Sequence, residues 1–173
     1  GVKQFFDPER VIVNPELSLA GGAIRGWDRK TTYYFQMIQS LAAHYEFDIE
    51  TAFRELPEHL QNVVLYGSGK EKVEFHYANS RGLQIRQQHR FEGVLPNLDR
   101  RYRETESSAV REELSRFLNS QPCPDCSGTR LNRSARNVFV AGQSLPQISA
   151  MAVGRARAFF SELKLEGWRS RLV

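Results

Sequence analysis

Cysteine is almost absent from this chain of 173 residues, which contains only Cys123 and Cys126. Two cysteines this close in sequence cannot form the disulfide framework that holds small secreted domains together, which favours a reducing compartment. The chain also lacks any long uncharged apolar run and any basic, apolar leader, so the sequence indicates no membrane span and no signal peptide. We therefore expect a cytoplasmic protein that has no membrane partner.

Groups of catalytic residues are missing as well. No Ser can be placed near a His and a carboxylate, and neither paired acids in an apolar setting nor a carboxylate metal cluster is visible. Gly67-Ser68-Gly69-Lys70 suggests a phosphate-binding loop, but Val64 and Glu71 stand where that motif needs Gly and Ser or Thr. The end of a helix and the entry to a hairpin explain these glycines better. We expect a chain that is not an enzyme and binds no nucleotide.

The sequence has the composition of a folded protein. Its residues are 40% apolar and 25% charged, and its length suits one globular domain or one domain with a flanking module. The chain begins at Gly1 without an initiator Met and enters Phe5 to Arg10 with no helix-capping signal. We expect it to be a segment of a longer protein.

Positive charge is concentrated in the later part of the chain. Residues 1–60 hold six Lys and Arg against nine Asp and Glu, whereas residues 61–173 hold eighteen against eleven. No acidic residue occurs from Cys126 to Ser161. Such an asymmetry indicates an anionic partner such as nucleic acid, although an ordinary solvated surface of a slightly basic protein is the alternative.

The periodicity of the apolar residues predicts an α+β fold that is mostly helical, with a small antiparallel β-hairpin and a cysteine knuckle. Thr31-Thr32 is expected to cap a first helix that reaches Tyr45, and Pro57 and Gly67 to bound a second. Alternation predicts two strands, around Val73–Tyr77 and Leu83–Ile85, joined by a turn at 79–82. The remaining elements expected are a helical stretch over 94–118 that breaks near Ser107-Ser108, a short strand over 138–140, a turn at Gly142 and a final helix over 148–163.

Cys123-Pro124-Asp125-Cys126-Ser127-Gly128 has the form of a zinc knuckle, in which two thiolates point at one metal ion. A structural zinc ion requires four ligands, and the four histidines lie well upstream of this single pair. Three interpretations remain open: half of a zinc site, a redox pair, and a structural or accidental pair. Cys123 and Cys126 are the candidate metal ligands.

Arginines are interleaved with aromatic residues over residues 77–103. This surface can bind phosphates through its charges and present rings to unstacked bases. Alternatively, the aromatic residues form the core while the arginines make a solvated face paired to Glu104 and Glu106. The candidate DNA-binding residues are Arg81, Arg86, Arg90, Arg100, Arg101 and Arg103, together with Arg130 and Arg133 beside the cysteine turn.

Several long stretches, in order, resemble one protein family. They are Phe6-Asp7-Pro8-Glu9-Arg10-Val11-Ile12, Asn14 to Ile24, Val64 to Lys70, Phe91-Glu92-Gly93-Val94, Arg100-Arg101-Tyr102, Glu104 to Leu114 and Cys123 to Leu131. Together they are similar to the DNA-binding insertion domain of the UvrA family of bacterial nucleotide-excision-repair ATPases. The likeness covers nearly the whole chain, but it includes no Walker motif, no ABC signature and no UvrB-binding segment.

The resemblance implies a function and partners that composition alone does not. It implies an origin in a dimeric ABC-type ATPase that uses ATP and Mg²⁺, searches double-stranded DNA for damage and passes the site to UvrB. It also implies that the insertion domain interrupts a zinc module, so that Cys123 and Cys126 are the second half of a site whose first half precedes Gly1. On this basis residues 1–120 form the insertion domain, and residues 121–173 form the half zinc module and the start of the signature domain.

Two functions remain from the sequence. The first is a DNA-binding module that grips the backbone without reading base sequence. The second is a structural module whose basic face packs against other domains of the same ATPase without touching DNA.

Overall fold

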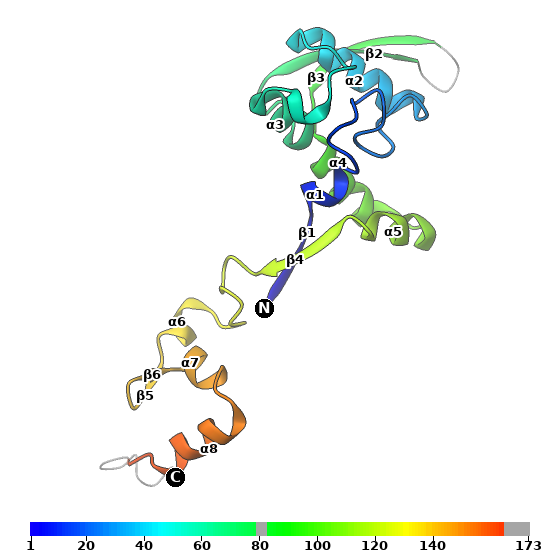
Figure 1. Cartoon of the computed structure of the whole chain (residues 1–173). Helices are drawn as coiled ribbons and strands as arrows, with labels where there is room; N and C mark the ends of the chain where they lie inside the picture. Colours follow the sequence, from blue (N-terminus) through cyan, green and yellow to red (C-terminus); the bar gives the residue numbers. More distant parts are fainter. Residues whose placement is uncertain (79–82, 165–173) are drawn as a thin grey trace. The chain divides into compact units, whose positions relative to one another are not determined.

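The computed structural model describes residues 1–78 and 83–164, and these divide into two compact units. One unit comprises Gln4–Asn119, and the other comprises Gly1–Lys3 with the chain from Ser120 onward. Helices dominate and the strands form small sheets of two, so the α+β class is confirmed (Figure 1). The cysteine knuckle is not established by the fold. Within the described residues, no helix combines the length and the apolar character needed to cross a membrane.

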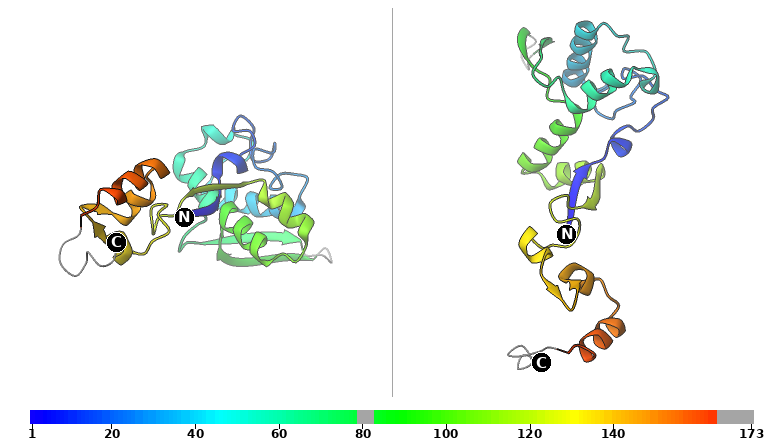
Figure 2. Two further views of the ribbon diagram at one scale, coloured as in Figure 1. Left: turned by 90° about the horizontal axis from the view of Figure 1, so that it is seen from below. Right: turned by 90° about the vertical axis from the view of Figure 1, so that its left-hand side faces the viewer.

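The larger unit is organised around helix α2 and a β-hairpin. Helix α2 (Thr32–Tyr45) buries Met37, Ile38 and Leu41, whose spacing of three and four residues places them on one face. Strands β2 (Lys72–Ala78) and β3 (Gln84–Arg90) pair antiparallel, and β2 packs against α2. Figures 1 and 2 show α2 beside this hairpin from three directions.

The remaining elements belong to this unit, except that β1 and β4 each extend past its boundary at Gln4 and Asn119. In chain order they are β1 (Val2–Phe6), α1 (Pro8–Val11), the 3-10 turn η1 (Phe53–Glu55), α3 (Glu58–Tyr66), α4 (Val94–Glu104), α5 (Ser108–Ser115) and β4 (Leu118–Pro122). Strands β1 and β4 form a two-stranded sheet. The buried apolar cluster extends in sequence from Phe6 to Leu114, so it belongs to this unit.

The helices and the hairpin of this unit lie where the sequence predicts them, but several details differ. The helical stretch expected to reach residue 118 ends at Ser115, and Leu118 begins β4. Strand β3 runs from Gln84 to Arg90, beyond the expected Ile85. Thr31 precedes α2 as expected, but its side chain makes no capping hydrogen bond. The expectation that residues 5–10 carry no capping signal was wrong: Asp7 accepts a hydrogen bond from the Glu9 amide, and Pro8 begins α1. The turn predicted at 79–82 lies outside the described residues.

The smaller unit contains α6 (Arg133–Arg136), β5 (Phe139–Val140), β6 (Gln143–Ser144), α7 (Leu145–Ser149) and α8 (Val153–Ser161). The single final helix predicted over 148–163 was wrong. A capping box between Ser144 and Gln147 starts α7 at Leu145, and Ala152 adopts an extended backbone that separates α7 from α8. Ile148 is the only buried apolar side chain among the described residues of this unit.

Candidate nucleic-acid interface

One face of the β2–β3 hairpin is basic and exposed. Val73 and Phe75 point into the core, so the alternate residues of β2 face away from it. The register pairs Lys72 with Arg90, Glu74 with Gln88 and His76 with Arg86, which places these six residues on the same outward side. We call these six residues the hairpin face. It carries three permanent cations, Lys72, Arg86 and Arg90, against the single carboxylate of Glu74.

Helix α2 holds the hairpin in place through the edge of β2. The Ser40 hydroxyl accepts a hydrogen bond of 3.0 Å from the His76 amide, and the Gln36 side-chain oxygen accepts one of 3.0 Å from the Ala78 amide. These bonds satisfy strand donors that would otherwise be unpaired at a sheet edge. The hairpin is therefore fastened to the core by its inner face and its edge, while the hairpin face stays accessible.

The three cations of the hairpin face differ in their partners. The Arg86 Nε lies 2.8 Å from the Glu74 carboxylate, and His76 Nε2 lies 2.8 Å from the same oxygen. The Arg86 guanidinium lowers the pKa of Glu74, so this carboxylate stays ionised and neutralises one cation. Arg90 and Lys72 form no ion pair with any residue the structure describes. They supply the uncompensated positive charge.

Helix α4 carries Arg100, Arg101 and Arg103, and each has a different environment. Arg100 donates to Glu92 at 2.8 and 3.1 Å and to Glu104 at 3.1 Å, while Arg103 lies 2.8 Å from Asp99. The Arg101 guanidinium lies over the Tyr34 ring, 5.4 Å from its centroid. Exposed ion pairs contribute only about 0–1 kcal/mol to stability, so a DNA phosphate can replace a carboxylate as the partner of Arg100 or Arg103. These carboxylates nevertheless make the net positive charge around α4 smaller than the number of arginines suggested.

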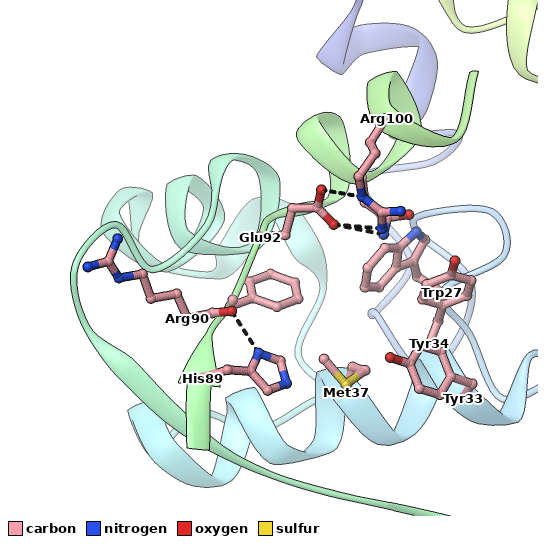
Figure 3. A pocket seen from close by; sticks show the side chains of 10 residues that line it. Trp27, Tyr33, Tyr34, Met37, His89, Arg90, Glu92 and Arg100 are labelled. Carbon is pink, nitrogen blue, oxygen red and sulfur yellow. Dashed lines mark hydrogen bonds and ion pairs between the residues drawn. The ribbon is translucent and has the colours of Figure 1, made fainter. Parts of the chain in front are cut away.

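A cavity of about 200 Å³ lies between α2, the end of β3 and α4. Figure 3 shows Met37 from α2 at its base, His89 on one side, Tyr33, Tyr34 and Trp27 on the other, and the Glu92–Arg100 pair beside it. The His89 ring stacks on Phe75 at 4.4 Å, and its Nδ1 lies 2.8 Å from the Arg90 carbonyl oxygen. Arg100 lines this cavity beside Glu92, whereas the Arg90 side chain extends away from it (Figure 3).

Glycines fix the position of the residues around this cavity. Gly67 ends α3 and Gly93 precedes α4, and both adopt positive φ, at 99° and 91°. The Ser68 hydroxyl accepts a hydrogen bond from the Phe91 amide and donates one to the Glu71 carbonyl. The segment Gly67 to Lys70 therefore ends a helix and leads into the hairpin, as predicted, with its hydroxyl already occupied.

Glu71 stands where a phosphate-binding loop would need Ser or Thr, and it has partners of its own. The Tyr45 hydroxyl donates to it at 2.6 Å, and His44 Nε2 lies 3.0 Å from its other oxygen. These hydrogen bonds lower the pKa of Glu71, while burial and the same carboxylate raise the pKa of Tyr45 to about 12. The ionised carboxylate of Glu71 would repel a phosphate at this loop.

The structure distributes the predicted arginines over several places. Arg86 and Arg90 lie on the hairpin face, and Arg100, Arg101 and Arg103 lie on α4. Arg81 lies outside the described residues. Arg130 and Arg133 are exposed residues of the smaller unit. Of the aromatic residues expected to meet bases, His89 and Phe91 line the cavity, whereas Tyr77 and Tyr102 pack against the core.

Sequence reasoning missed two groups of cations. Lys72 belongs to the hairpin face, and strand alternation with Arg86 and Arg90 was the signal that could have identified it. Arg25 and Lys30 line a second hollow of about 400 Å³ together with glycines from the loop that includes Gly21 and Gly22. The glycine-rich composition indicated a loop, but not that its cations would gather around a hollow.

The cysteine turn lies within the smaller unit. The Gly1 ammonium donates to Cys126 Sγ at 3.0 Å, and the Gly1 carbonyl accepts from the Cys123 amide at 2.9 Å. This ammonium, followed by the Arg130 amide, lowers the pKa of the Cys126 thiol to about 7, and a hydrogen bond from Cys123 contributes. Among the described residues, no group of three or more His, Cys, Asp or Glu side chains is placed to hold a metal ion.

Comparison with known proteins assigns the larger unit to a family. The family model for the UvrA DNA-binding domain matches residues 7–116. UvrABC system protein A of Salmonella typhimurium and that of Escherichia coli K12 are each 59% identical over the whole chain, and that of Xylella fastidiosa is 52% identical. The chain spans 18% of the length of these relatives.

A solved structure shares the fold. The crystal structure of UvrA2 from Deinococcus radiodurans superimposes with a TM-score of 0.66 at 19% identity, and the alignment covers 99% of this chain and 22% of that one. At this identity the likeness concerns the fold alone. The family match and the identity of the relatives carry the assignment: the chain belongs to the UvrA DNA-binding domain family.

Proposed function

We propose that this chain is the DNA-binding part of a nucleotide-excision-repair ATPase and that it grips the DNA backbone without reading sequence while damage is being located. The observation that carries the proposal is the hairpin face, where Lys72 and Arg90 are exposed and lack carboxylate partners among the described residues, in a chain of the UvrA DNA-binding domain family. Exposed cations on a rigid strand pair bind phosphates by charge, and backbone charge carries no base information.

The α4 arginines extend this interface in the proposal. The end of β3 and helix α4 line the same cavity, so the two elements that carry these cations are neighbours. Arg101 and Arg103 lie further along α4. Further candidate contacts are Arg130 and Arg133 in the smaller unit and Arg81 outside the described residues. Damaged double-stranded DNA is the proposed ligand. The proposed compartment is the cytoplasm.

The parent protein supplies the other activities in this proposal. The relatives are named UvrABC system protein A, and the chain spans less than a fifth of their length. We assign ATP and Mg²⁺ binding, ATP hydrolysis, UvrB contact and pairing with a second UvrA to regions outside this chain. The chain itself is proposed to have no catalytic activity.

The cysteine pair is proposed to be half of a structural zinc site. Cys123 and Cys126 are two thiols three residues apart, a spacing that lets both ligate one ion, but two ligands leave a tetrahedral ion incomplete. In the intact parent the ion would fix the cysteine turn to a second pair of ligands. The boundary between the DNA-binding part and this module is proposed near residue 120.

Salt-dependent binding to duplex DNA tests the proposed function. The chain should bind paired duplexes of different sequence with equal affinity, and the affinity should fall as salt rises. A variant with Lys72, Arg86 and Arg90 replaced by Ala should bind more weakly and show a salt slope smaller by up to about three. The matched control replaces Arg29 and Arg54, exposed arginines that pair with Glu50 and Glu16 on other loops.

The outcome separates the two functions left open by the sequence. Weakened binding in the hairpin variant with unchanged binding in the control supports DNA contact. Unchanged affinity and salt slope in a folded hairpin variant contradicts it. No duplex binding by the unaltered chain would favour a module that packs against other domains of its ATPase.

A further inference from the structure

The loop that leads into helix α2 borders an open hollow with two unpaired cations. We call it the loop hollow; its volume is about 400 Å³, and its lining includes Gly22, Arg25, Gly26, Asp28, Lys30 and Thr31. Arg25 and Lys30 are exposed, and neither forms an ion pair or a side-chain hydrogen bond with any residue the structure describes. A hollow in which cations outnumber carboxylates attracts anions.

The neighbouring arginines are paired, although they stand in the same part of the chain. Residues 1–60 hold more acidic than basic side chains, so carboxylates are available. Arg29 lies between Arg25 and Lys30 in sequence and pairs with Glu50, and Arg54 pairs with Glu16. The absence of such partners for Arg25 and Lys30 among the described residues therefore indicates that these two cations are available to a ligand.

The single carboxylate of the loop hollow reduces its positive charge without cancelling it. Asp28 Oδ1 accepts a hydrogen bond of 2.9 Å from the Lys30 amide, which holds the turn before α2. Asp28 stands against two cations, so the loop hollow keeps a net positive charge. A β-carbon placed on Gly26 would meet nothing within 4 Å, so the wall is open there and a large ligand can approach.

The amino end of α2 adds positive potential to the loop hollow. Thr31, the residue before the helix, lines the hollow, and its side chain makes no capping hydrogen bond. The first bond to the helix comes from the Phe35 amide, which donates to the Thr31 carbonyl, so the amides of the first turn have no helix carbonyl as a partner. The helix dipole makes this end partially positive, and the first turn of α2 carries no acidic residue.

The loop hollow and the cations of the hairpin face lie at opposite ends of α2. The His76 amide donates to Ser40 and the Ala78 amide to Gln36, so β2 runs antiparallel to the helix. Glu71, which precedes Lys72, contacts His44 and Tyr45 at the carboxyl end of α2. Helix α2 has 14 residues, which places the loop hollow about 20 Å from Lys72. The two groups of cations are therefore separate sites.

We propose that the loop hollow binds a phosphodiester group of the DNA backbone and is a second anchoring point, separate from the hairpin face. This inference rests on the proposed function. Arg25 and Lys30 attract the anionic oxygens by charge, and the Thr31 hydroxyl is an additional donor. A free phosphate ion on two exposed cations has no further contacts, whereas each DNA phosphate that is neutralised releases counterions from the polyanion. DNA is therefore the favoured source of the phosphate.

The test measures the affinity of the chain for a fully paired duplex over a range of salt concentrations by fluorescence anisotropy. The double variant Arg25→Gln and Lys30→Gln should bind about tenfold more weakly at low salt and show a salt slope smaller by up to about two. Asp28→Asn keeps the oxygen that accepts from the Lys30 amide and removes the negative charge, so it should bind more tightly. The matched control, Arg29→Gln with Arg54→Gln, loses the same charge and should keep its salt slope.

Combination with the hairpin variant tests whether the sites are separate. Replacing Lys72, Arg86 and Arg90 by Ala together with Arg25→Gln and Lys30→Gln should lower log affinity by the sum of the two separate losses, because the sites are far apart. Arg25 and Lys30 are exposed, so the melting temperature of their double variant should match that of the unaltered chain.

The outcomes distinguish this inference from the proposed function. Unchanged duplex affinity and salt slope in the folded Arg25→Gln, Lys30→Gln variant overturn the loop hollow, while weakened binding in the hairpin variant leaves the proposed function intact. A second arm replaces chloride by inorganic phosphate at constant ionic strength. A melting temperature that rises with phosphate in the unaltered chain but not in the double variant, at equal duplex affinities, would identify a free-phosphate site and overturn DNA contact there. Failure of the unaltered chain to bind duplex overturns both.

Discussion

The backbones of Gly67 and Gly93 touch: a β-carbon on Gly93 would lie 2.5 Å from the Gly67 nitrogen. Gly67 ends α3 and Gly93 precedes α4, so this contact joins the helix before the β2–β3 hairpin to the helix after it. It also sets the path of Phe91 and Glu92, which line the cavity. The site therefore depends on two residues that have no side chain.

Replacing Gly93 by Ala should destabilise the chain strongly. The new methyl group would meet backbone atoms of Tyr66 and Gly67 at 2.5 Å, and φ at 91° strains any L side chain. We expect a loss of about 2–4 kcal/mol in the free energy of unfolding, measured by urea denaturation. Gly69→Ala is the control, because it has positive φ with nothing within 4 Å and should lose about 1 kcal/mol. Equal losses would contradict the close contact.

Arg90 and Arg103 should differ in their contribution to DNA binding. Both are exposed, but Arg103 is paired with Asp99, whereas Arg90 has no ion pair among the described residues. Arg90→Ala should weaken duplex binding several-fold and reduce the salt slope by about one. Arg103→Ala should change both less, because removing it also releases a carboxylate from its partner. Both affinities are measured by fluorescence anisotropy. A larger loss of affinity for Arg103→Ala than for Arg90→Ala would show that ion pairing does not determine how much an arginine contributes to DNA binding.

The sequence predicted those elements whose burial is periodic. Helix α2 and the hairpin were found because Ile38, Leu41, Val73 and Phe75 repeat with the period of their element. Strands β1 and β4 were missed because they are mostly exposed and pair across more than a hundred residues, which no local pattern reveals. The separation of α7 from α8 at Ala152 has no local signal either, since alanine favours helix.

The sequence predicted where several arginines lie on the fold but not their surroundings. Counting charges placed arginines correctly on the hairpin and on α4, yet it could not show which were already paired. The Arg100–Glu92 pair joins residues eight apart that meet only because Gly93 turns the chain into α4.

Acid should remove the contribution of Glu92 to stability. Its folded pKa is lowered, mainly by Arg100, from an ordinary value of 4.5. A depressed carboxylate stabilises the fold fully above its unfolded pKa and loses that contribution as the pH falls through the folded value. The melting temperature of Glu92→Gln should therefore lie below that of the unaltered chain at pH 7, and the difference should shrink below pH 4.5.

The control for this pH series is Glu58→Gln, at an exposed carboxylate with no ion pair among the described residues. It should shift the melting temperature little at neutral pH. A difference for Glu92→Gln that stays constant from pH 7 down to pH 3 would mean that the substitution acts through packing and not through the ion pair with Arg100.

Zinc should bind this chain weakly and matter little to the larger unit. Cys123 and Cys126 leave two positions of a tetrahedral ion open, and no third ligand joins them among the described residues. The buried apolar cluster lies within Gln4–Asn119, so its stability does not depend on the cysteine turn. Metal analysis after dialysis should give less than one zinc ion per chain, and EDTA should leave the main unfolding transition unchanged. The double variant Cys123→Ser and Cys126→Ser should behave in the same way. One tightly held ion per chain, whose removal by EDTA lowers the melting temperature, would require further ligands from this chain or from a second copy, and half-site ligation would then be wrong.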